Sequence, residues 1–164
     1  MAFTKPDEFL SRVELIDAEE LASLGVTVAL IDIDNTLVPR GTKEIPLSVV
    51  EWVDTLKRRG LSLCLISNNW HKEAFTYARA LDLPIVYRAL KPLPFAFLRA
   101  VRKAGGSRRS TVVIGDQLLT DVFGAHALRM RVILVLPQAS IDLMHTRILR
   151  RIERLFMHDA TPTR

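Results

Sequence analysis

Two aspartates lie two positions apart in Ile31-Asp32-Ile33-Asp34, directly after the strand-like run 26–30. Side chains alternate along an extended chain, so Asp32 and Asp34 should point to the same side. Two crowded carboxylates need a cation, a shared proton or water beside them. With a magnesium ion, one carboxylate could ligate the metal and attack phosphorus, while the other handles the leaving-group proton. A simple polar turn after a strand is the alternative interpretation.

Three more polar clusters follow strand-like apolar runs later in the chain. They are Ser67-Asn68-Asn69 after 61–66, Lys91-Pro92 after 84–86, and Gly115-Asp116 with Asp121 after 111–114. Each cluster alone could be structural: a helix cap, a helix start with Pro92 at its first position, or a turn and a charge at a helix N-terminus. The carboxyl ends of parallel strands meet at one edge of a sheet, so the four clusters together predict one functional site.

In these motifs the sequence resembles the haloacid dehalogenase superfamily of phosphatases. The residues of these motifs look most like those of the YqeG branch, which is related to phosphatidylglycerophosphate phosphatases. The matching segments are Asp32-Ile33-Asp34-Asn35-Thr36-Leu37, Ser67-Asn68-Asn69, Lys91-Pro92 and 115–122. The resemblance covers about residues 7–137 and implies a Rossmann-like α/β fold. His126 lies where the family more often has a Gly-Asn-Arg-like stretch, which leaves its role open.

The resemblance also implies catalytic roles. Asp32 would be the nucleophile that forms an aspartyl-phosphate, and Asp34 the acid for the leaving oxygen and the base for water. Ser67 and the amide of Asn68 would bind phosphoryl oxygens, and Lys91 would supply a fixed positive charge in the transition state.

The expected cofactor is Mg²⁺, bound by oxygen ligands. The residues implied as its ligands are Asp32, Asp34, Asp116 and Asp121. Asp34 could contribute its backbone carbonyl, and Asp121 could act through water or by orienting Lys91.

Between the motifs the chain alternates strand and helix, which predicts a mostly parallel sheet of about five strands covered on both faces, a three-layer sandwich. Helices are expected from Ser48, where Ser48-Val49-Val50-Glu51 reads as a capping box, to Gly60, and at 71–82, 93–104 and 120–129. A last strand is expected at 131–136. Cys64 falls in a central strand, which indicates a buried structural thiol.

The gaps from Asn35 to Ser67 and from Ser67 to Lys91 are too short for a cap domain. An uncapped site suits substrates that cover it themselves, such as a protein, a nucleic-acid end or a lipid head group at a surface. The loop 38–43 is the candidate flap, and Arg40 and Lys43 are expected to reach an anionic substrate, with solvated charges as the alternative.

The 164 residues are expected to form a single domain, 1–164, with a basic amphipathic helix at about 140–157. The net charge of +5 and the sequence pI of 9.8 favour anionic partners. That helix could pack on the domain, bind a partner or lie on an anionic membrane. No apolar run reaches the roughly 18 residues of a membrane span, so a cytoplasmic protein, peripheral at most on the inner membrane face, is expected.

The expected function is a magnesium-dependent phosphomonoesterase, with phosphatidylglycerophosphate as the leading substrate. A phosphatase for soluble sugar phosphates, nucleotides or a phosphoprotein is the alternative, and a non-catalytic binding or assembly module is a further one. The expected binding partner of this protein is a phosphorylated small molecule or a phospholipid head group. Nucleic acid is not expected, because no nucleic-acid-binding signature is present. Whether the chain forms a homo-oligomer stays open at this point.

Overall fold

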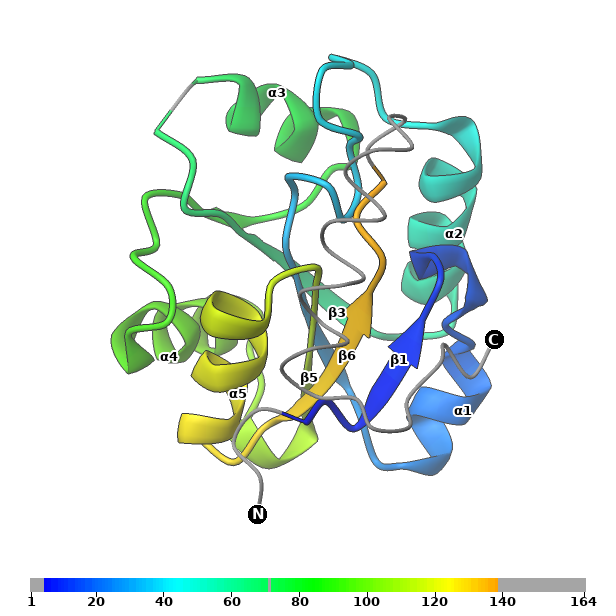
Figure 1. Ribbon diagram of the computed structural model, residues 1–164. Helices are drawn as coiled ribbons and strands as arrows, with labels where there is room; N and C mark the ends of the chain where they lie inside the picture. Colours follow the sequence, from blue (N-terminus) through cyan, green and yellow to red (C-terminus); the bar gives the residue numbers. More distant parts are fainter. Residues whose placement is uncertain (1–4, 71, 139–164) are drawn as a thin grey trace, which may run out of the picture.

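The structure is a computed structural model that describes residues 5–70 and 72–138, and its centre is a six-stranded sheet (Figure 1). The strands are β1 (Glu8–Leu10), β2 (Val28–Ile31), β3 (Ser62–Ile66), β4 (Ile85–Val86), β5 (Thr111–Gly115) and β6 (Arg131–Val135). Their order is β1-β6-β5-β2-β3-β4, and every pair is parallel. The predicted α/β fold with a parallel sheet is confirmed.

The sheet has one strand more than the expected five. β1 is only three residues long and pairs with the free edge of β6. Its last residue, Leu10, is buried. Its short segment has no apolar run of its own, so its pairing depends on the edge that β6 provides.

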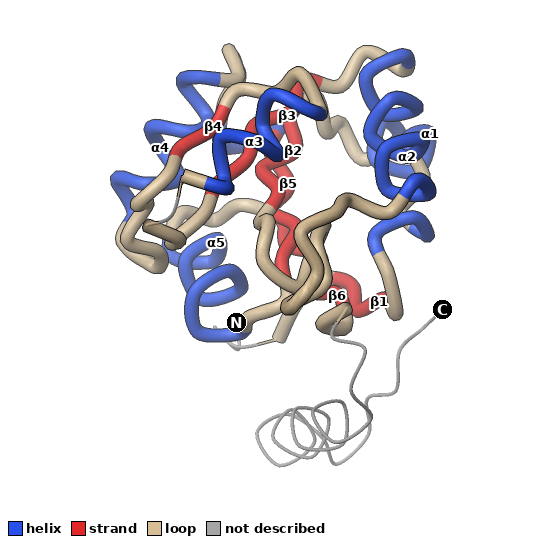
Figure 2. Tube along the Cα trace, turned by 90° about the horizontal axis from the view of Figure 1, so that it is seen from above, coloured by secondary structure: helices blue, strands red, loops and turns tan. Residues whose placement is uncertain are grey.

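Helices cover both faces of this sheet, as the view from above shows (Figure 2). The helices are α1 (Ala18–Ser23), α2 (Leu47–Arg58), α3 (Glu73–Ala80), α4 (Pro94–Lys103) and α5 (Phe123–Ala127), with a π-helical turn, η3 (Leu118–Val122), before α5. Apolar residues of α1, α2 and α3 share one core cluster with one face of the strands, and those of α4 and α5 share a second cluster with the other face. The molecule is therefore a three-layer sandwich.

The capping box predicted at Ser48 was wrong, and the alternative interpretation of Pro92 as the first residue of a helix does not hold either. Ser48 does not cap α2: the helix follows Pro46, and the Ser48 hydroxyl donates a hydrogen bond to Glu14 Oε1 (2.7 Å). Pro92 does not open α4, whose first turn holds Pro94, and the Lys91-Pro92 peptide bond is cis. Local motifs are ambiguous where a distant side chain offers a competing partner.

The helix expected at 120–129 begins earlier, as η3, and only 123–127 is α-helical. Cys64 is buried, and burial raises the pKa of its thiol to about 11. The described chain between β2 and β3 and between β3 and β4 carries one helix each and no cap domain.

The basic helix expected at about 140–157 lies outside the described residues. Among the residues that the structure does describe, no helix has the length and apolar character to cross a bilayer.

Candidate active site

The four polar clusters meet at the carboxyl edge of the sheet. Asp32 continues from β2, and its backbone amide still donates to Ile114 O of β5 (2.9 Å). Ser67 follows β3, and Asp116 follows β5. Parallel strands bring their carboxyl ends together, which explains why side chains so far apart in sequence become neighbours here.

Lys91 is the electrostatic centre of this site. Its Nζ lies 2.5 Å from Asp32 Oδ1 and 2.7 Å from Asp121 Oδ1, and all three side chains are at most 5% exposed. Burial alone would lower the pKa of Lys91, but the carboxylates of Asp121 and Asp32 outweigh burial and raise it above its usual value. The lysine therefore stays charged and holds both carboxylates in place.

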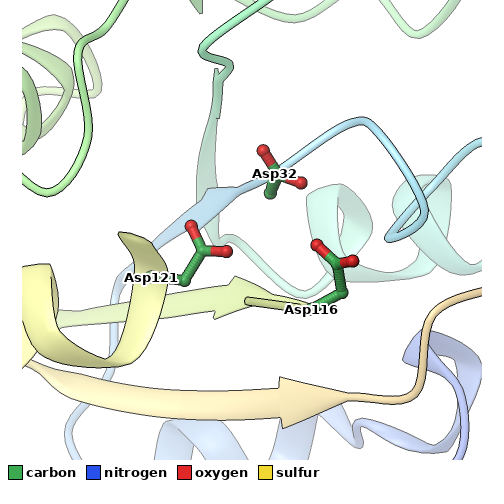
Figure 3. Close-up of side chains that lie close together, drawn as sticks. All are labelled: Asp32, Asp116 and Asp121. Carbon is green, nitrogen blue, oxygen red and sulfur yellow. The ribbon is translucent and has the colours of Figure 1, made fainter. Parts of the chain in front are cut away.

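Three carboxylates face one another beside this lysine (Figure 3). Asp32, Asp116 and Asp121 each offer one oxygen, and these oxygens lie within 4.8 Å of one another. All three residues are buried. Three buried carboxylates against one ammonium leave negative charge to be compensated, which is the environment of a divalent cation.

Asp116 supplies a second observation for a cation. Its Oδ1 is buried and has no hydrogen-bond partner within residues 5–70 and 72–138. Burial, followed by the charges of Asp32 and Asp121, raises the pKa of Asp116 to about 8. Buried polar atoms are normally paired, so an unpaired carboxylate oxygen beside two others fits a metal ligand. For Asp32 also, burial raises the pKa, and Lys91 opposes the shift.

The orientation of the Asp121 carboxylate is fixed by the backbone from Gly115 to Gln117. The amide of Gln117 donates to Asp121 Oδ2 (3.2 Å). A Cβ atom built on Gly115 would lie 2.4 Å from both Cγ and Oδ2 of Asp121. Glycine is therefore required at position 115, because the carboxylate occupies the space that any other side chain would need.

Replacing this glycine, Gly115→Ala, is expected to push the Asp121 carboxylate away from Lys91 and from the metal position. We expect the activity of this site to fall by about 10- to 100-fold, as for loss of an outer-shell partner, with weaker metal binding. Titration with Mg²⁺, followed by protection against thermal unfolding, measures the second effect. Unchanged metal affinity in a folded variant would contradict this explanation of Gly115.

Asp34 faces a different set of partners. Its carboxylate accepts hydrogen bonds from Ser67 Oγ and from Asn69 Nδ2, both at 3.4 Å, and it is not part of the three-carboxylate cluster. Ser67 Oγ also accepts from the amide of Asn69 (3.0 Å). The polar triplet thus binds Asp34 and does not cap α3, whose N-cap is Lys72.

Asn68 has a contact that the sequence analysis missed. Its side chain accepts from the Lys91 amide (2.7 Å) and donates to the Lys91 carbonyl (3.0 Å). This double contact fixes the backbone of the lysine loop. The sequence predicts a role for the Asn68 backbone amide alone, because no sequence pattern signals a side-chain contact across 23 residues.

Thr36 was also missed as a neighbour of the nucleophile candidate. Its hydroxyl, fully buried, lies 3.4 Å from Asp32 Oδ2 and can donate to it. The preceding Asn35 has a positive φ of 62° and accepts from the Arg40 amide through its side chain (3.1 Å). This turn changes the direction of the chain after Asp34. The motif Asp34-Asn35-Thr36 was the sequence feature from which the position of Thr36 beside Asp32 could have been predicted.

The two flap cations lie at the surface. Arg40 is exposed, and Lys43 forms an exposed ion pair with Glu73 of α3 (3.2 Å). Such a pair is easily exchanged for another anion. Their contact with substrate stays a prediction. His126 belongs to α5, and its Nε2 lies 3.9 Å from Asp7 Oδ2.

Residues 89–140 match a family model described as HAD-hydrolase-like. The chain is 38% identical over 152 residues to the "Probable phosphatase YqeG" of Bacillus subtilis (strain 168), and this alignment covers 93% of this chain and 88% of that protein.

Solved structures with the same fold are more distant in sequence. The cobalt-bound deoxy-D-mannose-octulosonate 8-phosphate phosphatase (YrbI) of Haemophilus influenzae superposes with a TM-score of 0.57 at 13% identity, covering 77% of this chain and 88% of that one. A putative HAD family hydrolase of Streptomyces avermitilis gives 0.56 at 15% identity, covering 80% and 75%. These likenesses support the fold.

Proposed function

We propose a mechanism for this chain, which belongs to the HAD-like phosphatase family of YqeG. Its phosphatase reaction passes through an aspartyl-phosphate on Asp32. The observation that carries this proposal is the buried arrangement of Asp32, Lys91 and Asp121, with the unpaired oxygen of Asp116 beside it. A nucleophilic carboxylate held by a cation and shielded from water is positioned for in-line attack.

In the first step Asp32 attacks the phosphorus, and the bond from phosphorus to the leaving oxygen breaks. Asp34 gives its proton to that oxygen. In the second step Asp34 takes a proton from water, which attacks the phosphorus and releases phosphate, so that the Asp32 carboxylate is restored. The half-buried position of Asp34, away from the carboxylate cluster, suits an exchange of protons with water and substrate.

The phosphoryl oxygens need donors and positive charge in both steps. Ser67 Oγ, the amide of Asn68 and the ammonium of Lys91 are proposed to supply them. A bound Mg²⁺, held by Asp32, Asp116 and Asp121 with the backbone carbonyl of Asp34, would neutralise charge on the transferred group. Lys91 also holds Asp32 and Asp121 in the orientation that a cation requires.

The raised pKa of Asp116 gives a pH dependence to this cation site. In the metal-free fold Asp116 keeps its proton up to about pH 8, whereas the unfolded chain loses it near 3.8. Its contribution to the free energy of unfolding is therefore complete at low pH and lost as pH rises through 8. We expect metal-free thermal melts to show this loss and Asp116→Asn to lack that part of it.

The same proton competes with the metal, because a ligating carboxylate must be deprotonated. Mg²⁺ should raise the melting temperature more at about pH 8 than at about pH 6 in the unmodified protein. A pH-independent effect of Mg²⁺ would contradict the assignment of Asp116 as a ligand.

For the substrate, we propose phosphatidylglycerophosphate, hydrolysed to phosphatidylglycerol. The family resemblance supports it, and so does the lack of a cap domain in the described chain, because a head group at a membrane surface needs no lid from the enzyme.

The test is phosphate release from phosphatidylglycerophosphate in mixed micelles, beside soluble sugar phosphates, nucleotides and a phosphopeptide, with Mg²⁺ and with chelator. We expect the lipid to give the highest kcat/KM and chelator to stop turnover. Turnover of only soluble compounds would remove the lipid proposal and keep the mechanism.

A further inference from the structure

Large apolar side chains stand exposed on the loops that carry the site residues. Leu119, between Asp116 and Asp121, is 76% exposed, and Trp70, which follows the Ser67 triplet, is 62% exposed. Leu90 and Leu93 flank Lys91-Pro92, and Phe123 follows η3; all three are exposed too. These five residues, Trp70, Leu90, Leu93, Leu119 and Phe123, are called the apolar rim here.

The loops of the apolar rim are directly linked to one another. Asn68 bonds the backbone of Lys91, and Lys91 bonds Asp121. A Cβ atom on Gly124 would lie 3.3 Å from Pro92 Cα, so the start of α5 packs closely on the lysine loop. The loops that carry the rim are therefore connected to one another beside the active site.

A cationic and aromatic group adjoins the apolar rim. The guanidinium of Arg88 stacks over the Trp70 ring at 4.5 Å and lies 5.7 Å from the Tyr87 ring. Arg88 and Trp70 are both exposed. Tryptophan with a neighbouring arginine is typical of the level where lipid head groups meet acyl chains, because the ring is apolar and the guanidinium can reach phosphate.

We propose that the apolar rim docks on the surface of an anionic phospholipid bilayer and so brings the phosphate of a lipid head group to Asp32. The proposal rests on the phosphomonoesterase function proposed above and assigns the surface that selects a membrane-borne substrate. The rim leucines and Phe123 would enter the acyl boundary, and Arg88 would contact lipid phosphate.

Two further observations favour a bilayer as the occupant. The chain carries a net charge of +5, which attracts an anionic surface over the range of a Debye length. The catalytic loops themselves carry the rim, so a molecule docked there would cover the site and exclude water, as a cap domain does in other enzymes.

The experiment compares the double variant Leu93→Ser/Leu119→Ser with the control Leu24→Ser. Serine is a good residue at the N-cap position that Leu93 occupies, so the fold should hold. Leu24 is 48% exposed, similar to Leu93, but it precedes β2 at the opposite edge of the sheet. Binding is measured by co-sedimentation with vesicles of equal parts phosphatidylcholine and phosphatidylglycerol.

We expect the double variant to bind these vesicles at least about tenfold more weakly and the control to bind like the unmodified protein. Turnover of p-nitrophenyl phosphate should stay within about twofold in all proteins, while turnover of phosphatidylglycerophosphate in vesicles falls about tenfold in the double variant alone.

Two binding results would overturn the docking surface: no vesicle binding by the unmodified protein, or equal binding by the double variant. Dissociation of a homo-oligomer by the double variant would also overturn it, because the rim would then be a contact between copies. Preference for a phosphoprotein substrate that depends on the rim would also overturn it. Vesicle binding that depends on the rim, without turnover of any monoester, would refute the proposed function alone.

Discussion

Asp32→Asn is expected to reduce phosphate release by roughly 10⁴-fold or more, since it removes the nucleophile rather than a group that assists it. Asparagine keeps the size of the side chain and can still contact Lys91 and Thr36, so the protein should remain folded. The measurement is phosphate release under saturating substrate, with circular dichroism to verify the fold.

Asp54→Asn serves as the matched control, because Asp54 is an exposed carboxylate in α2. It should retain full activity. Turnover by Asp32→Asn at a rate comparable with the unmodified enzyme would exclude Asp32 as the nucleophile and would shift attention to Asp34.

Lys91→Met is expected to lose both activity and stability. Methionine removes the ammonium that pairs with both Asp32 and Asp121, so two buried carboxylates lose their partner. Breaking a buried ion pair in this way costs about 3–5 kcal/mol of unfolding free energy. Urea unfolding of the metal-free protein measures this cost.

Two further variants separate charge from packing. Lys57→Met removes a partly exposed lysine that donates to Leu81 O (3.0 Å), and we expect a change within about 1 kcal/mol. Adding Asp121→Asn to Lys91→Met should recover part of the stability and none of the activity. A Lys91→Met protein as stable as the Lys57→Met protein would contradict the role of Lys91 in holding the carboxylates.

The parallel sheet and its central strands were predictable because long apolar runs and strand–helix alternation are strong local signals. β2, β3 and β5 have such runs. β1 and α1 were not predicted, because three or six residues hold too little periodicity and depend on neighbours for their burial.

The site was predictable as a set of positions but not as a set of contacts. The spacing of Asp32, Ser67, Lys91 and Asp116 after strands was enough to expect one edge. The contacts of Asn68 with the Lys91 backbone and of Ser48 with Glu14 are tertiary, and residue type alone indicates neither.

Gly115 illustrates the same limit. In the sequence it reads as a turn glycine, whereas in the structure its missing side chain leaves room for the Asp121 carboxylate. The exposure of Leu119 was likewise not predictable, because apolar residues beside a helix are normally assigned to the core.

The most direct test of the proposed mechanism is to trap the phosphoenzyme in Asp34→Asn with ³²P-labelled p-nitrophenyl phosphate. Nitrophenolate leaves without an acid, so the first step should proceed and hydrolysis, which needs Asp34 as base, should stall. After acid quench, the mechanism predicts hydroxylamine-sensitive label on the peptide that contains Asp32. Hydroxylamine-resistant label on Ser67, or turnover with no labelled protein, would contradict it.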